Sequence, residues 1–249
     1  MMPYFSYIQI QLGPITLYTW GLFLGLAFLI GSCLTLKEAK RKGINQKKIF
    51  WLIILVFSAG LLGARLFSPG GLMFYGGFFG GLIIGWIYIK KSKLNFYQIA
   101  DLVIPAIALG IFIGRIGCSL INDHQGAITN LPWAILWPDG MLRHPVAEYL
   151  ALNALIMFFV LWLLRNKFKK PGQLFIIFLI WYSLARFFLD FTRVTNTPLA
   201  DPHYSGLFVS QWISLFILIG CGIILICKSR GIIFQLRELF GKSSQDQPD

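Results

Sequence analysis

Charged residues are scarce in this sequence of 249 residues. They make up 13% of the chain, about half of the roughly 25% that soluble domains carry. Hydrophobic residues make up 57%, and the mean hydropathy is +0.70. This composition excludes a disordered chain and a water-soluble globule. We therefore expect a protein whose solvent is lipid.

Several motifs of cofactor chemistry are also missing. The four cysteines, Cys33, Cys118, Cys221 and Cys227, include no Cys-x-x-Cys spacing, so a disulfide framework and a zinc site are not expected. No Walker motif, His-Glu-x-x-His helix or serine-triad spacing occurs. The first 36 residues hold no lysine or arginine, whereas a secretory signal begins with basic residues. We expect no metal, no organic cofactor and no cleaved signal peptide.

What the sequence does have is long apolar runs of the length that crosses a bilayer, roughly 20 residues each. Only helices satisfy their own backbone inside lipid, so we expect an all-α polytopic membrane protein of about seven transmembrane helices. The expected spans are residues 15–36, 49–67, 71–89, 99–116, 147–164, 173–191 and 207–227.

Two shorter segments flank these runs. Residues 6–12 alternate polar and apolar side chains, which predicts a short interfacial strand. Residues 231–240 place their apolar side chains on one helical face, which predicts a helix lying on the cytoplasmic leaflet. We expect a single membrane-embedded domain over 1–249, with outer loops 117–146 and 192–206 and a cytoplasmic amphipathic tail, 228–249.

The basic residues predict the orientation. Most of them fall in alternate loops and in the tail, at residues 37–48, 90–93, 165–170 and 228–242. Since basic loops stay in the cytoplasm, the N-terminus is expected outside and the C-terminus inside. Basic segments beside a membrane also attract anionic lipid, so the net charge of +12 needs no nucleic acid.

The basic residues left over are all arginines on the expected outer side. They are Arg65, Arg115, Arg143, Arg186 and Arg193. Most of the acids lie on the same side, so structural ion pairs are one interpretation. The choice of arginine over lysine favours planar, bidentate recognition of an oxyanion.

Mid-span positions carry almost no charge. Residues 15–36, 71–89, 102–114, 149–164 and 207–227 hold no Asp, Glu, Lys, Arg or His. Proton-coupled transporters and ion pathways carry such groups at mid-depth. Their absence favours chemistry near the outer surface.

Two polar clusters stand at the ends of expected spans. Arg115, Asn122, Asp123 and His124 follow one another within ten residues, and a half-buried arginine there needs either a carboxylate such as Asp123 or a ligand phosphate. A second cluster, Tyr182, Arg186, Asp190 and Arg193, has spacings of four, four and three, which predicts one helix face. It suits either a structural Arg186–Asp190 pair or a lipid headgroup at the mouth of a cavity, which Gln211 could join.

Two further motifs have ordinary explanations. The glycines at 76/80, 77/81 and 81/85 predict close helix packing in lipid, and Tyr75 places a polar tip beside them. His144, within Arg143-His144-Pro145, is a lone histidine in a loop, and such histidines more often have no catalytic role.

At these residues the sequence resembles the bacterial prolipoprotein diacylglyceryl transferases. The similarity runs over most of the chain, and a Gly-Arg-x-Gly segment followed by an Arg-His-Pro segment is its most specific part. It includes Tyr18-Thr-Trp20-Gly21, Gly63-Ala-Arg65, Gly70-Gly71-Leu-Met-Phe-Tyr75-Gly76-Gly77, Asp101, Gly114-Arg115-Ile-Gly117, Asn122-Asp123 with Gly126, Arg143-His144-Pro145, Tyr182-Ser-Leu-Ala-Arg186 and Asp190-Phe-Thr-Arg193.

The resemblance implies an enzyme of the bacterial cytoplasmic (inner) membrane with its active site at the outer face. It implies transfer of a diacylglyceryl group from phosphatidylglycerol to the lipobox cysteine thiol in the signal peptide of a prolipoprotein, leaving glycerol phosphate. Arg115 and Arg186 would then hold the headgroup, with Asp123 and Asp190 near them, and Tyr75, Asp123 or Asp190 could assist the thiol. The other substrate-binding residues expected are Asn122, Gly126, Tyr182, Arg193, His144, Arg65 and Gln211.

The chain departs from that family at several positions. The family often has histidine where Tyr75 stands, asparagine at Cys118, and glutamate at Asp123 and Asp190. The shorter acids keep their charge but have less reach. Two other classes remain open from the residues alone: a transporter or flippase for an anionic lipid or small anion, and a structural membrane scaffold. The transferase interpretation depends on Arg115 and Arg186 binding one lipid headgroup at the outer face of the membrane.

Overall fold

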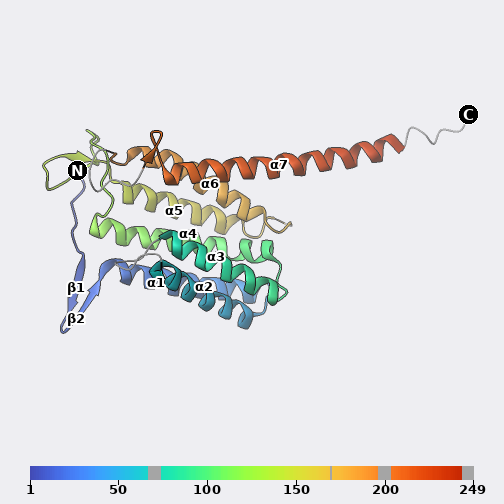
Figure 1. Cartoon of the computed structure of the whole chain (residues 1–249), viewed down its shortest axis with the longest axis horizontal. Coiled ribbons are helices and arrows are strands. Elements are labelled where there is room, and N and C mark those ends of the chain that lie inside the picture. Colours follow the sequence, from blue (N-terminus) through green and yellow to red (C-terminus); the bar gives the residue numbers. More distant parts are fainter. Residues whose placement is uncertain (67–73, 169, 196–202, 243–249) are drawn as a thin grey trace, which may run out of the picture. The chain divides into compact units, whose positions relative to one another are not determined.

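The computed structural model of the protein describes residues 1–66, 74–168, 170–195 and 203–242. Residues 228–242, Leu12, Ile15, Phe74 and Tyr75 are described by backbone alone. The helices are α1 (Thr19–Arg41), α2 (Gln46–Leu66), α3 (Phe74–Lys91), α4 (Phe96–Ile121), α5 (Val146–Leu164), α6 (Gln173–Leu189) and α7 (Val209–Lys242), with a 3₁₀ turn at Asp190–Thr192 (Figure 1). Three antiparallel hairpins pair β1 (Gln9–Leu12) with β2 (Ile15–Tyr18), β3 (Ile135–Leu136) with β4 (Leu142–Arg143), and β5 (His203–Tyr204) with β6 (Leu207–Phe208).

Within the described residues, six helices are long and apolar enough to cross a membrane. They are Thr19–Arg41, Gln46–Leu66, Phe96–Ile121, Val146–Leu164, Gln173–Thr192 and Val209–Cys227. Their outward side chains are apolar: Leu29, Phe159 and Phe216 are each more than half exposed. A water-soluble protein would not leave so much apolar surface uncovered. The predicted all-α polytopic membrane protein is confirmed to this extent, and a seventh span, at α3, stays a prediction.

The first expected span begins later than predicted. Residues 15–18 were expected in the helix, but they form β2, which pairs with β1 across a turn at Gly13. Gly13 has φ of +60°, a conformation that glycine adopts without strain. The predicted strand over 6–12 is therefore present in its second half, and it belongs to a hairpin.

The last helix is longer than predicted. The expected span 207–227 and the expected helix 231–240 lie in one continuous helix, α7, which ends at Lys242. The side chains of this C-terminal part lie outside the described residues, as do residues 243–249 and residues 67–73, between the second and third expected spans.

The chain forms two compact units. Unit 1 comprises residues 1–178 and 192–194, and unit 2 comprises residues 179–191 and 195–249. In unit 1, α2 packs on α3, and α4 packs on both α1 and α5 (Figure 1).

Glycines let α2 and α3 approach closely. A Cβ atom at Gly80 would lie 2.6 Å from the carbonyl oxygen of Ala59, and one at Gly77 would lie 3.0 Å from that of Gly60. A Cβ at Gly63 would overlap the backbone of Gly76. The packing role predicted for the glycine repeat is confirmed, since only residues without a side chain fit this contact.

The basic loops after α1, α3 and α5 gather at one end of unit 1. Lys48 Nζ donates to the carbonyl oxygen of Ser92 at 2.9 Å, and Arg41 donates to Asn166. Arg41 Nε also donates to the buried Glu38 at 2.8 Å. A cluster of buried apolar side chains lies at the same end: Ala39, Ile49, Leu52, Ile89, Ile99 and Leu102.

The N-terminal segment and the 122–145 loop meet at the other end of unit 1. Tyr7 N donates to the carbonyl oxygen of Leu120 at 2.9 Å. The β3–β4 hairpin is held by the buried Arg143, whose Nη2 and Nε lie 2.6 and 3.2 Å from Asp139 Oδ2 and whose Nη1 donates to the carbonyl oxygen of Gly126 at 3.2 Å. The bonds from Arg143, together with one from Met141 N, lower the pKa of Asp139 below its usual value.

Gly80→Ala is expected to destabilise unit 1. The added methyl group meets backbone, which cannot rotate away, so α2 and α3 must separate at a cost of about 1–3 kcal/mol. Thermal unfolding in detergent measures the change. Gly220→Ala is the matched control, because nothing lies within 4 Å of a Cβ at that helical glycine. A melting temperature of Gly80→Ala equal to that of the control would contradict the packing role.

Asp139→Asn is expected to loosen the β3–β4 hairpin. Because the folded pKa of Asp139 is lowered, the wild-type ion pair contributes above the ordinary carboxyl pKa of about 3.9 and is lost as pH falls through the lowered value. Amide hydrogen exchange over 127–144, corrected for intrinsic rates, should be faster in the variant at neutral pH, with α4 amides unchanged. Equal protection in both proteins would show that the pair holds nothing.

Candidate active site

The first polar cluster is created by the way α4 ends. Asn122 caps the helix in the left-handed conformation, with φ of 46° and ψ of 49°, a conformation that asparagine tolerates better than most residues. Its side chain is buried and donates to the carbonyl oxygen of Phe5 at 2.8 Å. The chain thereby turns back, and Asp123 and His124 lie over Cys118 in the last turns of α4.

Arg115 and Asp123 do not form the ion pair that the sequence offered. Asp123 Oδ1 contacts His124 Nδ1 instead. Arg115 Nη1 lies 3.4 Å from His124 Nε2. Among the described residues no carboxylate lies within ion-pair distance of Arg115, a half-buried guanidinium. A cation in that setting is suited to an external anion.

Cys118, Asp123 and His124 form a group that could hold a metal ion. One ligand atom from each lies within 4.8 Å of the other two. The sequence predicts no metal site, because it contains no paired cysteines. The signal that could have pointed to this group is a cysteine, an acid and a histidine within seven residues, across a helix end.

The second cluster lies in unit 2, apart from Arg193. Arg186 Nε lies 3.3 Å from Asp190 Oδ2, and both side chains are largely buried. Arg186 Nη1 is buried too and has no hydrogen-bond partner among the described residues. Ser210 donates to Asp190, so the carboxylate is held from two sides. The Arg186 guanidinium is held at Nε, and its Nη1 remains able to donate to a ligand.

The prediction that all four residues share one helix face is wrong for Arg193. The helix α6 ends at Leu189 and tightens into the 3₁₀ turn Asp190–Thr192. Arg193 lies beyond that turn, where its backbone pairs with Gly126 in unit 1. The spacing rule fails because it assumes that the α-helix continues.

Both ends of the Gln211 side-chain amide form hydrogen bonds with backbone groups. It is buried near the start of α7, where its Nε2 donates to the carbonyl oxygen of Phe187 at 3.0 Å and its Oε1 accepts from Phe208 N at 2.9 Å. Its predicted contact with substrate stays a prediction, as does that of Tyr182, which lies half-buried on α6.

The remaining predicted residues lie around the 122–145 loop or at helix ends. Gly126 lies so close to the backbone of His144 that a Cβ atom would overlap it. His144 Nδ1 is 3.3 Å from Tyr149 Oη, and burial lowers the pKa of His144. Arg65 is exposed in the last turn of α2. The side chain of Tyr75 lies outside the described residues.

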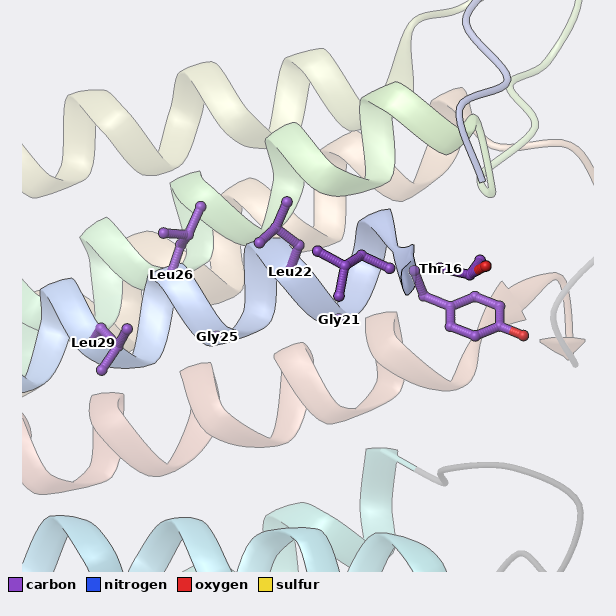
Figure 2. A pocket seen from close by; sticks show the side chains of 8 residues that line it. Thr16, Gly21, Leu22, Gly25, Leu26 and Leu29 are labelled. Atoms are coloured by element: carbon purple, nitrogen blue, oxygen red, sulfur yellow. The ribbon is translucent and has the colours of Figure 1, made fainter. Parts of the chain in front are cut away.

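A shallow apolar groove runs along α1 in unit 1. Thr16, Leu17 and Tyr18 of β2 line it together with Gly21, Leu22, Gly25, Leu26 and Leu29 of α1 (Figure 2). Gly21 and Gly25 have nothing within 4 Å of a Cβ position, so they leave the hollow open. On the same turns of α1, Trp20 interacts with the Cys118 thiol and Phe23 packs on Gly117. Neither of these two residues lines the groove.

Comparison with known proteins gives the same family as the motifs. The family model of prolipoprotein diacylglyceryl transferases matches residues 7–227. A protein of Clostridioides difficile (strain 630), named phosphatidylglycerol–prolipoprotein diacylglyceryl transferase, is 33% identical over 232 residues, covering 86% of this chain and 91% of that protein.

Relatives from other bacteria carry the same name. That of Bacillus licheniformis is 31% identical over 262 residues, covering 93% of this chain and 94% of the relative. That of Bordetella parapertussis is 29% identical over 255 residues, covering 90% and 95%. With its family match extending from the first hairpin into α7, the chain belongs to the prolipoprotein diacylglyceryl transferase family.

Proposed function

We propose that the protein transfers the diacylglyceryl group of phosphatidylglycerol to the lipobox cysteine thiol of prolipoproteins, forming a thioether and releasing glycerol phosphate. This is the first step of bacterial lipoprotein maturation. The observation that carries the proposal is the family match over residues 7–227, with relatives named for this reaction. The arginine geometry supports it, because the reaction needs fixed donors for a phosphate.

Arg115 is proposed to bind the phosphate of the lipid. Its guanidinium has no carboxylate within ion-pair distance among the described residues, and a planar guanidinium can donate two parallel hydrogen bonds to phosphate oxygens. Negative charge grows on the phosphate as the thiol sulfur attacks the glycerol carbon. Donors that are already in place stabilise that charge more than they stabilise the ground state.

Arg186 is also proposed to bind phosphate, on the geometry of its own unit. Asp190 fixes Nε, while the buried Nη1 still lacks a partner among the described residues. A buried donor without a partner costs about 1–3 kcal/mol, which a bound phosphate oxygen would recover. Asp190 then acts by positioning Arg186, and Tyr75 and Asp123 remain the other candidates for assisting the thiol.

The groove on α1 is proposed to take an acyl chain of the lipid. Apart from the tips of Thr16 and Tyr18, its lining is apolar, and it lies on α1, the helix that packs on α4, which carries Arg115. An acyl chain there would stay in the bilayer while the headgroup reached the guanidinium. No other occupant is needed to cover this surface.

We propose a multi-pass protein of the bacterial cytoplasmic membrane, with α3 as a seventh span and the active site at the outer face. The basic loops at one end of unit 1 support a cytoplasmic position for that end. The N-terminus and the 122–145 loop then lie outside. We propose that residues 1–249 form one membrane-embedded domain. The transporter and scaffold alternatives gain no support from the relatives, whose names describe a transferase.

Arg186→Ala is expected to lower the rate of diacylglyceryl transfer without unfolding the protein. Losing one hydrogen-bond donor to the transition state typically lowers a rate by roughly 10²–10³-fold, so we expect a loss of that size or larger. The assay incubates a lipobox peptide with labelled phosphatidylglycerol and measures the added diacylglyceryl mass. Arg186→Lys keeps the charge but loses the fork, so it should recover only part of the rate.

Lys47→Ala, at an exposed lysine of the basic end, is the control and should keep full activity. An Arg186→Ala protein as active as this control would remove the role assigned to Arg186. A folded wild-type protein that adds no diacylglyceryl group would overturn the proposed reaction itself.

The orientation predicts which loops a membrane-impermeant maleimide reaches in intact spheroplasts. A cysteine in place of the exposed Ile128 should be labelled directly, because its loop is outside. A cysteine in place of the exposed Lys91 should be labelled only after permeabilisation. The reverse pattern would invert the proposed topology.

A further inference from the structure

Glu148 is a partly buried carboxylate between α4 and α5 of unit 1. It lies in the first turn of α5, where the positive end of the helix dipole favours a negative charge. Its Oε1 accepts a hydrogen bond from the hydroxyl of Ser119 on α4, the helix on which α5 packs. Its Oε2 is buried and has no hydrogen-bond partner among the described residues. The carboxylate is therefore anchored through one oxygen and unsatisfied at the other.

The charge of Glu148 is not neutralised by the described part of the chain. No lysine, arginine or histidine nitrogen there lies at ion-pair distance from its carboxylate. A buried acceptor without a donor is costly, and more so when it is charged. The last side-chain torsion of a glutamate is soft, and both Glu148 and Ser119 are partly exposed. A small rotation can therefore bring Oε2 to a hydrogen-bond donor from outside the protein.

Arg115 supplies the complementary half of a binding site. Arg115 and Ser119 are four residues apart in the continuous helix α4, so their side chains lie on one face, one turn apart. Among the described residues Arg115 has no carboxylate at ion-pair distance. An unpaired cation thus lies one turn of α4 from the serine that holds an unpaired anion. A ligand with an anionic group and, a few bonds away, a hydrogen-bond donor would satisfy both.

The headgroup of phosphatidylglycerol has this form, because its phosphate is followed by a glycerol with free hydroxyls. We propose that Glu148 accepts a hydrogen bond from a hydroxyl of the headgroup glycerol while Arg115 binds the phosphate, and that Glu148 thereby selects the lipid by its headgroup. The structure calls for a donor beside the phosphate, and the proposed function makes that donor a glycerol hydroxyl. To this extent the inference rests on the proposed function.

A lipid that lacks the hydroxyl leaves Oε2 buried and unsatisfied. A site that hydrogen-bonds a substrate hydroxyl rejects the analogue without it more strongly than an apolar pocket rejects a change of one methylene. Phosphatidylpropanol is such an analogue. It keeps the diacylglyceryl group, the phosphate and its charge, and it has a plain propyl chain in place of the headgroup glycerol. The reacting carbon and the mass added to a lipobox peptide are the same for both lipids.

The test compares the two lipids as substrates of the full-length protein in mixed micelles. The wild type should use phosphatidylglycerol with a kcat/KM about 10–100-fold higher than phosphatidylpropanol, the range for a hydrogen bond to a charged group. In the double variant Ser119→Ala/Glu148→Leu the two lipids should react at equal rates. Both partners are apolar there, so no buried polar group is left unpaired. Glu148→Gln keeps a neutral acceptor and should show an intermediate preference.

Leu152→Ala is the matched control, at an exposed side chain one turn further along α5. It should keep the headgroup preference of the wild type, and melting curves in detergent check that each variant is folded. A carboxylate that only holds α4 and α5 together would, when removed, lower the rates with both lipids by the same factor. An unchanged preference in the double variant would therefore overturn the role assigned to Glu148.

Lipid binding without turnover separates this proposal from the proposed function. Native mass spectrometry measures the competition of phosphatidylglycerol with phosphatidylpropanol for the wild type and the double variant. If the wild type binds phosphatidylglycerol preferentially through Glu148 but modifies no lipobox peptide, the binding role stands and the function fails. If the wild type transfers diacylglyceryl equally fast from both lipids, the function stands and the role of Glu148 is overturned. A preference for phosphatidylethanolamine over phosphatidylglycerol, lost in the double variant, would overturn the hydroxyl and identify an ammonium donor.

Discussion

The candidate site depends on one residue in a left-handed conformation. Asn122 ends α4 and reverses the chain, and its amide ties that point to Phe5. Without the reversal, Asp123 and His124 would continue along the helix and point away from Cys118. Asp123 contacts His124, and Arg115 lies beside His124 with no carboxylate at ion-pair distance among the described residues. A local backbone constraint thus sets the chemistry of the whole cluster.

A second constraint comes from lipid as the solvent. Apolar burial gives little reason for helices to associate where the surroundings are equally apolar, so contact between backbones takes over. The glycines of α2 and α3 supply that contact. At the basic end, charged and backbone groups pair with one another instead, as Glu38 with Arg41 and Lys48 with Ser92. The middle of the bundle is left free of charge, and the polar chemistry is confined to the ends.

Most of the helices could be predicted from the sequence, because a bilayer demands long apolar runs and forbids unpaired backbone. The predictions are wrong where the side-chain pattern does not determine the backbone conformation. Residues 15–18 are as apolar as a span, yet the Gly13 turn makes them a strand. Arg193 has a helical spacing in the sequence, but it lies beyond Leu189, where α6 ends.

The site could be predicted as a set of residues but not as a set of partners. The sequence singled out Arg115, Asp123 and His124 together, yet it offered Asp123 as the partner of Arg115. The choice of His124 instead follows from the cap at Asn122, a backbone dihedral that no spacing rule contains. The Arg186–Asp190 pair could be predicted, because its i, i+4 spacing reaches only one residue past the end of α6.

The groove on α1 has a consequence for turnover. It is a shallow hollow on the flank of a helix, kept open at Gly21 and Gly25. If it takes an acyl chain, as proposed, the lipid need not be extracted from its neighbours, and neither need the lipidated product. Diffusion in two dimensions would then deliver one and carry away the other.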